Sequence, residues 1–129
     1  MSTDSHDLEK IKMVYDYAKF HIGLYASVIA ASIAIGKIQG GETSPDSLLK
    51  VLAMMGVGCV LAAGACGAMV AVNTPDLLHK SYNEFKTTKL IALKTISMRV
   101  ENWLSWEHKF FWVGLLLILA TTLIAFNVS

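Results

Sequence analysis

The sequence predicts an all-α integral membrane protein with three transmembrane helices and a small cytoplasmic helical extension. Hydrophobic residues make up 54% of the 129 residues and charged residues only 16%, so a soluble domain of this size would lack the charge to cover its surface. The mean hydropathy of +0.51 agrees with this. Three long runs without any charged residue hold most of the apolar side chains. We therefore expect a single membrane domain over residues 1–129.

The three uncharged runs cover residues 20–36, 51–72 and 110–128. The first has about the minimum of roughly 17 residues that spans a bilayer core, and the other two are near or above the usual length of about 20. The third begins with Phe110, Phe111 and Trp112, an aromatic group typical of the membrane interface. None of the runs has the polar face that a helix of a soluble bundle needs. Each run is therefore expected to cross the membrane.

Basic residues predict the orientation of the chain, because they are enriched in cytoplasmic loops. Most of them lie before the first run or in the segment 73–109, and only Lys37 and Lys50 flank the loop 37–50. The nine in the first group are Lys10, Lys12, Lys19, Lys80, Lys86, Lys89, Lys94, Arg99 and Lys109. We expect an inner-membrane protein whose residues 1–19 and 73–109 are cytoplasmic, and whose loop 37–50 and C-terminus are external.

Both cytoplasmic segments are expected to be helical. Residues 1–19 hold charged pairs at helical spacing and no Gly or Pro, so a helix should continue from there into the first span. After the second span, Thr74 is expected to cap a helix that begins at Pro75 and Asp76.

A fold near residues 86–89 would then lead into an amphipathic helical arm. Its apolar face contains Leu93, Ile96, Val100 and Trp103. Packed on the N-terminal helix, this arm would form a small helical bundle, which is the arrangement that we favour. Laid flat, it would be a basic interfacial helix on anionic lipid.

Small residues recur at helical spacing in the first two spans. In lipid, such residues let helix backbones approach closely. The second span has them on every side, which favours contact with another chain, either a second copy or a partner membrane subunit; tight packing within one protomer is the alternative. The predicted packing residues are Gly23, Ser27 and Ala31 in the first span, and Gly56, Cys59, Ala63 and Gly67 in the second.

Three histidines, His21, His79 and His108, are expected at the cytoplasmic edge of the spans, where they are weak candidates for haem or metal ligands. No carboxylate or cysteine completes a ligand set, so we predict no metal site and no cofactor. The three runs contain no Asp, Glu, Lys or Arg, and such groups usually mark proton relays or intramembrane catalysis. The chain also lacks the common catalytic motifs, so we expect no enzyme.

A formal net charge of +1 gives no basic field for nucleic acid, which leaves the lipid bilayer and other membrane helices as the expected partners. The sequence favours a non-enzymatic protein that self-associates, acting as a pore-forming or membrane-perturbing effector, for example in phage defence, and controlled through its cytoplasmic helices. Two alternatives remain open. One is an accessory or assembly subunit of a larger membrane complex, and the other is an immunity-type protein that blocks a foreign pore.

Overall fold

The computed structural model describes residues 4–38, 47–92 and 94–128, and most of them are helical. Three long helices dominate: α1 (Ser5–Ile38), α2 (Ser47–Asn73) and α4 (Val100–Val128). Each is long and apolar enough to cross a membrane by length and composition. At this level the expected fold class is confirmed. Four short elements lie between α2 and α4, and two of them are strands.

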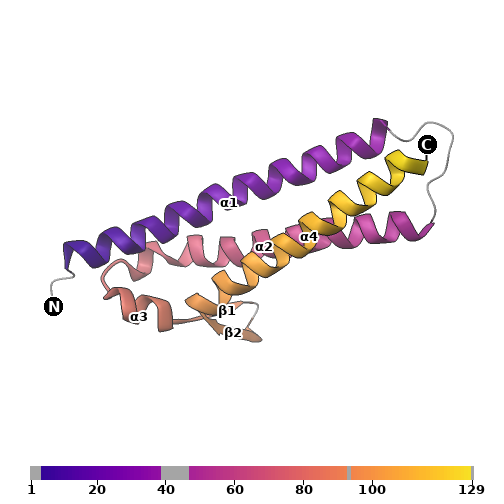
Figure 1. Cartoon of the computed structure of the whole chain (residues 1–129). Coiled ribbons are helices and arrows are strands. Elements are labelled where there is room, and N and C mark those ends of the chain that lie inside the picture. Colours follow the sequence, from indigo (N-terminus) through magenta and orange to yellow (C-terminus); the bar gives the residue numbers. More distant parts are fainter. Residues whose placement is uncertain (1–3, 39–46, 93, 129) are drawn as a thin grey trace.

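The long helices form an elongated molecule with two different ends (Figure 1). α1 and α2 run antiparallel, and α4 crosses them obliquely. α2 packs on both other helices, whereas α1 and α4 have few contacts with each other. The short elements and the N-terminus lie at one end. The C-terminus lies at the other end, where α1 ends and α2 begins (Figure 1). The turn residues expected in the external loop, Gly40–Gly41 and Ser44–Asp46, are outside the described residues.

α1 is one continuous helix, as the absence of Gly and Pro from residues 1–19 predicts. Its buried positions follow a seven-residue spacing at Ile11, Ala18 and Tyr25, whose side chains are at most 2% exposed. This spacing places them on one face of the helix, about two turns apart. The same face therefore packs against the rest of the molecule along both the charged and the uncharged part of α1.

The chain after α2 differs from the expected capped helix. Thr74 itself has helical backbone angles, and its hydroxyl donates to the carbonyl of Val70 at 2.7 Å instead of capping a new helix. Only a short 3-10 helix, η1 (Pro75–Leu77), follows it. The capped helix is α3 (Tyr82–Thr87), in which Ser81 and Glu84 form a reciprocal capping box. The helix start thus lies about two turns later in the sequence than predicted.

The helical arm predicted after residues 86–89 is wrong for residues 89–99. Here β1 (Lys89–Ala92) and β2 (Ile96–Arg99) pair antiparallel, from Lys89 opposite Arg99 to Ala92 opposite Ile96. Ile91, Thr95 and Ile96 are β-branched and favour extended backbone. An isolated two-stranded hairpin is marginal in water. This one is stabilised because Leu90, at 5% exposure, packs into the hydrophobic core.

The predicted apolar face of the arm is consequently divided between two elements. Ile96 lies in β2 and is 48% exposed. Val100 and Trp103 lie at the start of α4 and are buried. Leu93 is outside the described residues. Since a strand places successive side chains on opposite faces, the helical spacing that linked these four positions does not apply before residue 100.

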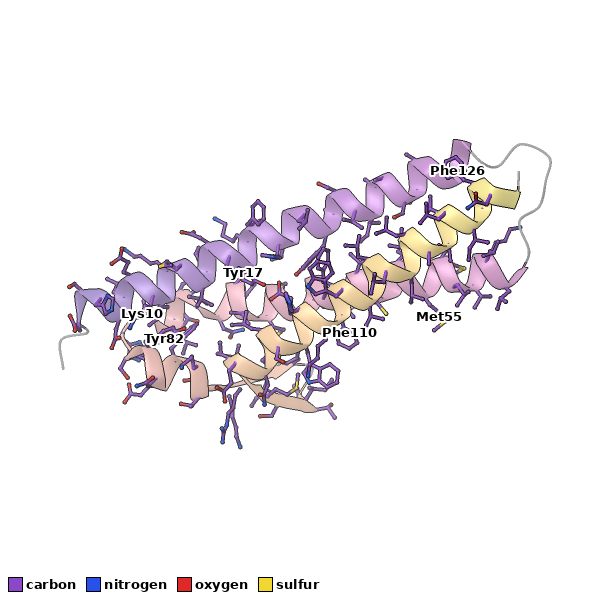
Figure 2. All side chains as sticks on the ribbon, in the orientation of Figure 1. Lys10, Tyr17, Met55, Tyr82, Phe110 and Phe126 are labelled. Atoms are coloured by element: carbon purple, nitrogen blue, oxygen red, sulfur yellow. The ribbon has the colours of Figure 1, made fainter. Side chains whose placement is uncertain are left out.

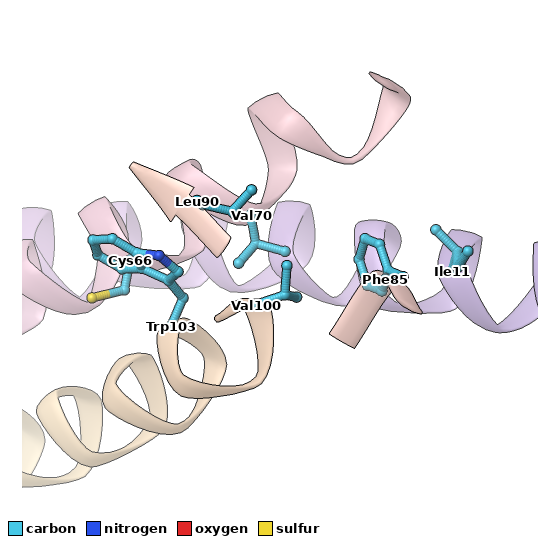
Figure 3. Packing of buried hydrophobic residues seen from close by; sticks show 7 residues of the cluster. All are labelled: Ile11, Cys66, Val70, Phe85, Leu90, Val100 and Trp103. Carbon is cyan, nitrogen blue, oxygen red and sulfur yellow. The ribbon is translucent and has the colours of Figure 1, made fainter. Parts of the chain in front are cut away.

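We call the head the part of the molecule formed by residues 5–18, 74–92 and 94–103. These residues pack on Cys66 and Val70 in the last turns of α2, so that α1, α2, α3, β1 and α4 share one buried cluster, which we call the core of the head (Figure 3). Lys10 of α1 also lies 5.5 Å from the ring centre of Tyr82 at the start of α3 (Figure 2). The N-terminal helix therefore packs on the segment after α2, as expected, and the element that it contacts there is α3. The buried cluster consists of Ile11, Cys66, Val70, Phe85, Leu90, Val100 and Trp103.

Candidate functional site

A buried carboxylate lies where the three long helices meet. Glu107 of α4 is 0% exposed, although the surrounding helices are apolar. It lies on the face of α4 that also holds Trp103 and Gly114, at spacings of four and seven residues. This face packs on α2. Ionisable residues are rare within apolar helices of this kind and usually have a function, so Glu107 is the residue around which we build the site.

The partner of Glu107 is a tyrosine on another helix. The Tyr25 hydroxyl of α1 donates to Glu107 Oε1 at 2.7 Å, and Tyr25 is only 2% exposed. Because α1 and α4 otherwise touch little, this bond is their main polar connection among the described residues. Hydrogen bonds between apolar helices fix which helix faces meet. The bond therefore sets how α1 sits against the other two helices.

Gly67 of α2 makes the space for the carboxylate. A Cβ atom added at Gly67 would lie 3.1 Å from Oε1 and 3.3 Å from Cδ of Glu107. Any larger residue would push the carboxylate away from α2 and change its geometry with Tyr25. The three helices thus contribute one residue each: an acid from α4, a hydroxyl donor from α1 and a glycine from α2.

Two buried polar atoms near this point have no hydrogen-bond partner: Glu107 Oε2 and the indole Nε1 of Trp103. The two residues are one turn apart on α4. His21, His108 and Cys66 are near enough to interact electrostatically with Glu107. The described residues contain no group of three His, Cys, Asp or Glu that could hold a metal ion. A carboxylate paired with one phenol can hold or release a proton, and it can act as a polar joint between helices.

The three histidines singled out from the sequence each make their own local contacts. His21 bonds through its ring to the carbonyl of Tyr17 on its own helix, at 2.9 Å. His108 lies one turn before Trp112 and accepts from its indole at 3.0 Å. His79 lies near α3 and lines an open hollow of about 490 Å³ with Lys80, Glu84, Thr87 and Thr88.

The small residues predicted in α2 face α4 within the same chain. A Cβ at Gly56 would lie 2.9 Å from Ile118, and one at Gly114 would lie 2.7 Å from the carbonyl oxygen of Gly56, so the two backbones nearly touch. Cys59 borders the same contact, Ala63 is fully buried and Gly67 faces Glu107. This stripe therefore has an intramolecular use.

The small residues predicted in α1 are placed differently. Gly23, Ser27 and Ala31 are all exposed, and a Cβ added at Gly23 would meet nothing within 4 Å. The hydroxyl of Ser27 donates to the carbonyl of Gly23 at 3.0 Å, so its polar group is satisfied within the helix. The row thus presents a smooth, narrow face that no other part of the described chain covers.

The sequence-based prediction missed Glu107 because it began the third span at Phe110. The helix begins ten residues earlier, at Val100. The signal that could have found the residue is its spacing from Val100 and Trp103: Glu107 falls on their apolar stripe, where a solvated glutamate would not be expected. No family model, curated protein or solved structure matches the chain. The functional argument therefore rests on the geometry of the chain itself.

Proposed function

We propose that the protein is an inner-membrane protein that inserts its three long helices in the bilayer with the head in the cytoplasm. The lysines and the arginine at the head end support this orientation, because basic residues are retained on the cytoplasmic side. Large apolar side chains remain exposed along all three helices, including Ile33 of α1, Met54 of α2 and Leu116 of α4. Lipid tails are the solvent that suits such side chains.

Within that membrane, the protein self-associates and acts as a small pore-forming or membrane-perturbing effector. The observation that carries this proposal is the uncovered row of Gly23, Ser27 and Ala31 on α1. Rows of small residues four apart drive helix pairing in lipid, since they allow long, close backbone contact. The stripe predicted on α2 is already occupied by α4, so of the two predicted packing rows the one on α1 is free to meet a second copy.

The head controls this assembly through the Glu107–Tyr25 bond. Val100 and Trp103, which lie two turns and one turn before Glu107 respectively, belong to the core of the head. A displacement of that core would move α4, and with it the carboxylate that holds Tyr25. Since α1 has few other contacts with α4, loss of this bond would change the position of α1 and of its assembly face.

A matched pair of glycine variants tests the proposal. Gly23 of α1 and Gly58 of α2 both have open space where a side chain would project, so G23L and G58L should leave the protomer intact. We expect the wild type and G58L to form homo-oligomers in mild detergent and to depolarise the membrane of a bacterium that expresses them. G23L should remain monomeric and harmless. A membrane-potential dye and cross-linking in the membrane provide the two measurements.

Other outcomes would identify a different function. Full polarisation at high expression, together with a monomer in detergent, would rule out the effector. Foreign membrane chains recovered in stoichiometric amounts with the wild type, but not with G23L, would indicate an accessory subunit that uses the same face of α1. Harmless expression that protects the cell against one pore-forming toxin would indicate an immunity-type protein.

A further inference from the structure

The β-hairpin exposes both apolar and basic side chains that the fold leaves uncovered. Ile91 is 65% exposed and Ile96 48% exposed, although isoleucine is among the residues most often buried. Lys89, Lys94 and Arg99 are exposed on the same hairpin. No acidic residue occurs between Glu84 and Glu101. Within the described residues, Arg99 pairs with Glu101 at 3.5 Å. The described part of the hairpin is therefore apolar and positively charged.

Ile91 and Ile96 lie on opposite faces of the hairpin, both next to its turn. In the proposed orientation, the direction of the hairpin brings this tip toward the membrane. β1 runs toward the same end of the molecule as α4, so the hairpin lies beside the first turns of α4 and not beyond them (Figures 1 and 3). β1 contacts α2, and β2 contacts α4. Trp106 is 44% exposed on that part of α4, with the ammonium of Lys109 at 5.1 Å from its ring centre. Exposed tryptophan beside lysine is typical of the headgroup layer.

We propose that the hairpin docks on the cytoplasmic leaflet and binds anionic lipid headgroups, with Ile91 and Ile96 entering the interface. Lysines at the edge of such a surface attract phosphate groups, and the isoleucines gain from leaving water. Lys94 has a φ of 61°, a conformation that an ordinary side chain rarely adopts. This turn residue therefore carries a positive charge at a position where glycine or asparagine is usual.

The depth of Ile91 in the membrane tests this docking. The variant I91C, made in a C59A/C66A background, is labelled with an environment-sensitive fluorophore and placed as full-length protein in nanodiscs of phosphatidylcholine with phosphatidylglycerol. N83C is the matched control, because Asn83 is exposed on α3 in the same head. We expect lipid-borne nitroxides to quench the label at residue 91 and iodide in solution to quench the label at residue 83. Circular dichroism checks that each variant is folded.

Charge removal separates binding to anionic lipid from simple apolar contact. K89Q/K94Q leaves the paired Arg99 in place. Since each lysine contributes to attraction by an anionic surface, the double variant should lower the partition of the hairpin into the lipid by about thirty-fold. Nanodiscs of phosphatidylcholine alone should have the same effect on the wild-type hairpin. Equal quenching in both lipids would overturn the assignment to anionic headgroups. If iodide quenched the labels at residues 91 and 83 equally, the docking itself would be overturned. The exposed hairpin would then be a candidate contact for a protein partner.

Discussion

Glu107 and Tyr25 illustrate how one polar contact can specify the arrangement of helices that are otherwise apolar. Apolar faces slide over each other at little cost, since lipid tails are as apolar as leucine. A buried carboxylate tolerates only positions in which a donor reaches it. The 2.7 Å bond from Tyr25 supplies that donor, and Gly67 supplies the space. The register of α1 against α4 therefore depends on these three residues.

Removing the Tyr25 hydroxyl should destabilise the protomer. Y25F leaves the carboxylate of Glu107 buried without its donor, and we expect a loss of about 1–2 kcal/mol, because hydrogen bonds to charged groups are worth more than neutral ones but less in membranes than in water. Unfolding in detergent by added dodecyl sulfate, followed by circular dichroism, measures the change.

Two controls separate the hydrogen bond from other effects of the substitution. Y17F removes the same hydroxyl from a tyrosine that is 39% exposed on α1, and it should change stability by less than about 0.5 kcal/mol. In an E107L background, Y25F should cost almost nothing, because the acceptor is gone. An equal loss with and without Glu107 would show that the hydroxyl acts through another group.

Among the elements, α2 and α4 form the tightest pair, and the glycine contact explains why. Gly56 and Gly114 lie opposite each other with their backbones in near contact. At this distance the two backbones attract each other through dispersion forces and through Cα–H···O contacts. By contrast, the outward faces of α2 and α4 carry large side chains such as Met55 and Phe126 (Figure 2). Each helix thus has one narrow face for packing and one broad face.

We expect G114A to loosen this pair. The added methyl group would lie 2.7 Å from the carbonyl oxygen of Gly56 and 2.8 Å from Val60 Cγ2. Backbone cannot move aside as a flexible side chain can, so the helices must separate, at a cost of about 1–3 kcal/mol. G58A is the control, since its methyl group meets nothing within 4 Å; its stability should be unchanged or higher by up to about 1 kcal/mol. The same unfolding measurement compares them, and equal stability of the two variants would contradict the close contact.

The elements also differ in how far the sequence alone predicts them. The three long helices can be predicted from the length of the runs without charged residues. The continuity of α1 can be predicted because no Gly or Pro interrupts its first part. The hairpin cannot be predicted in this way, because its turn lacks the glycine or asparagine that usually marks a hairpin turn. Lys94 adopts the left-handed conformation there instead. Glu107 was missed for a related reason: its burial depends on Tyr25 and Gly67, which are distant in sequence. Both the hairpin and the burial of Glu107 are therefore stabilised by tertiary contacts, which a local sequence pattern does not reveal.

At the scale of the whole molecule, the two ends differ in charge, and an odd number of long helices separates them. The N-terminus and the head lie at one end and the C-terminus at the other (Figure 1). Nine of the eleven basic residues belong to the head end or its border. If the helices insert together, this asymmetry favours one orientation over its reverse, because each lysine resists transfer to the external side.

Reporter fusions should therefore give opposite signals at the two ends. A fluorescent protein fused after Ser129 should stay dark and alkaline phosphatase at the same position should be active, because the proposed orientation places the C-terminus on the external side. Fused after Leu78, which follows two long helices, the fluorescent protein should be bright and the phosphatase inactive. Replacing Lys10, Lys12 and Lys19 with glutamine removes only part of the bias. Five basic residues remain between α2 and α4, and Lys109 remains in the first part of α4, so the orientation should persist. Fluorescence after Ser129 in the wild-type fusion would contradict both the orientation and a third crossing by α4. A bright signal there only in the variant with Lys10, Lys12 and Lys19 replaced would instead show that the N-terminal lysines alone orient the chain.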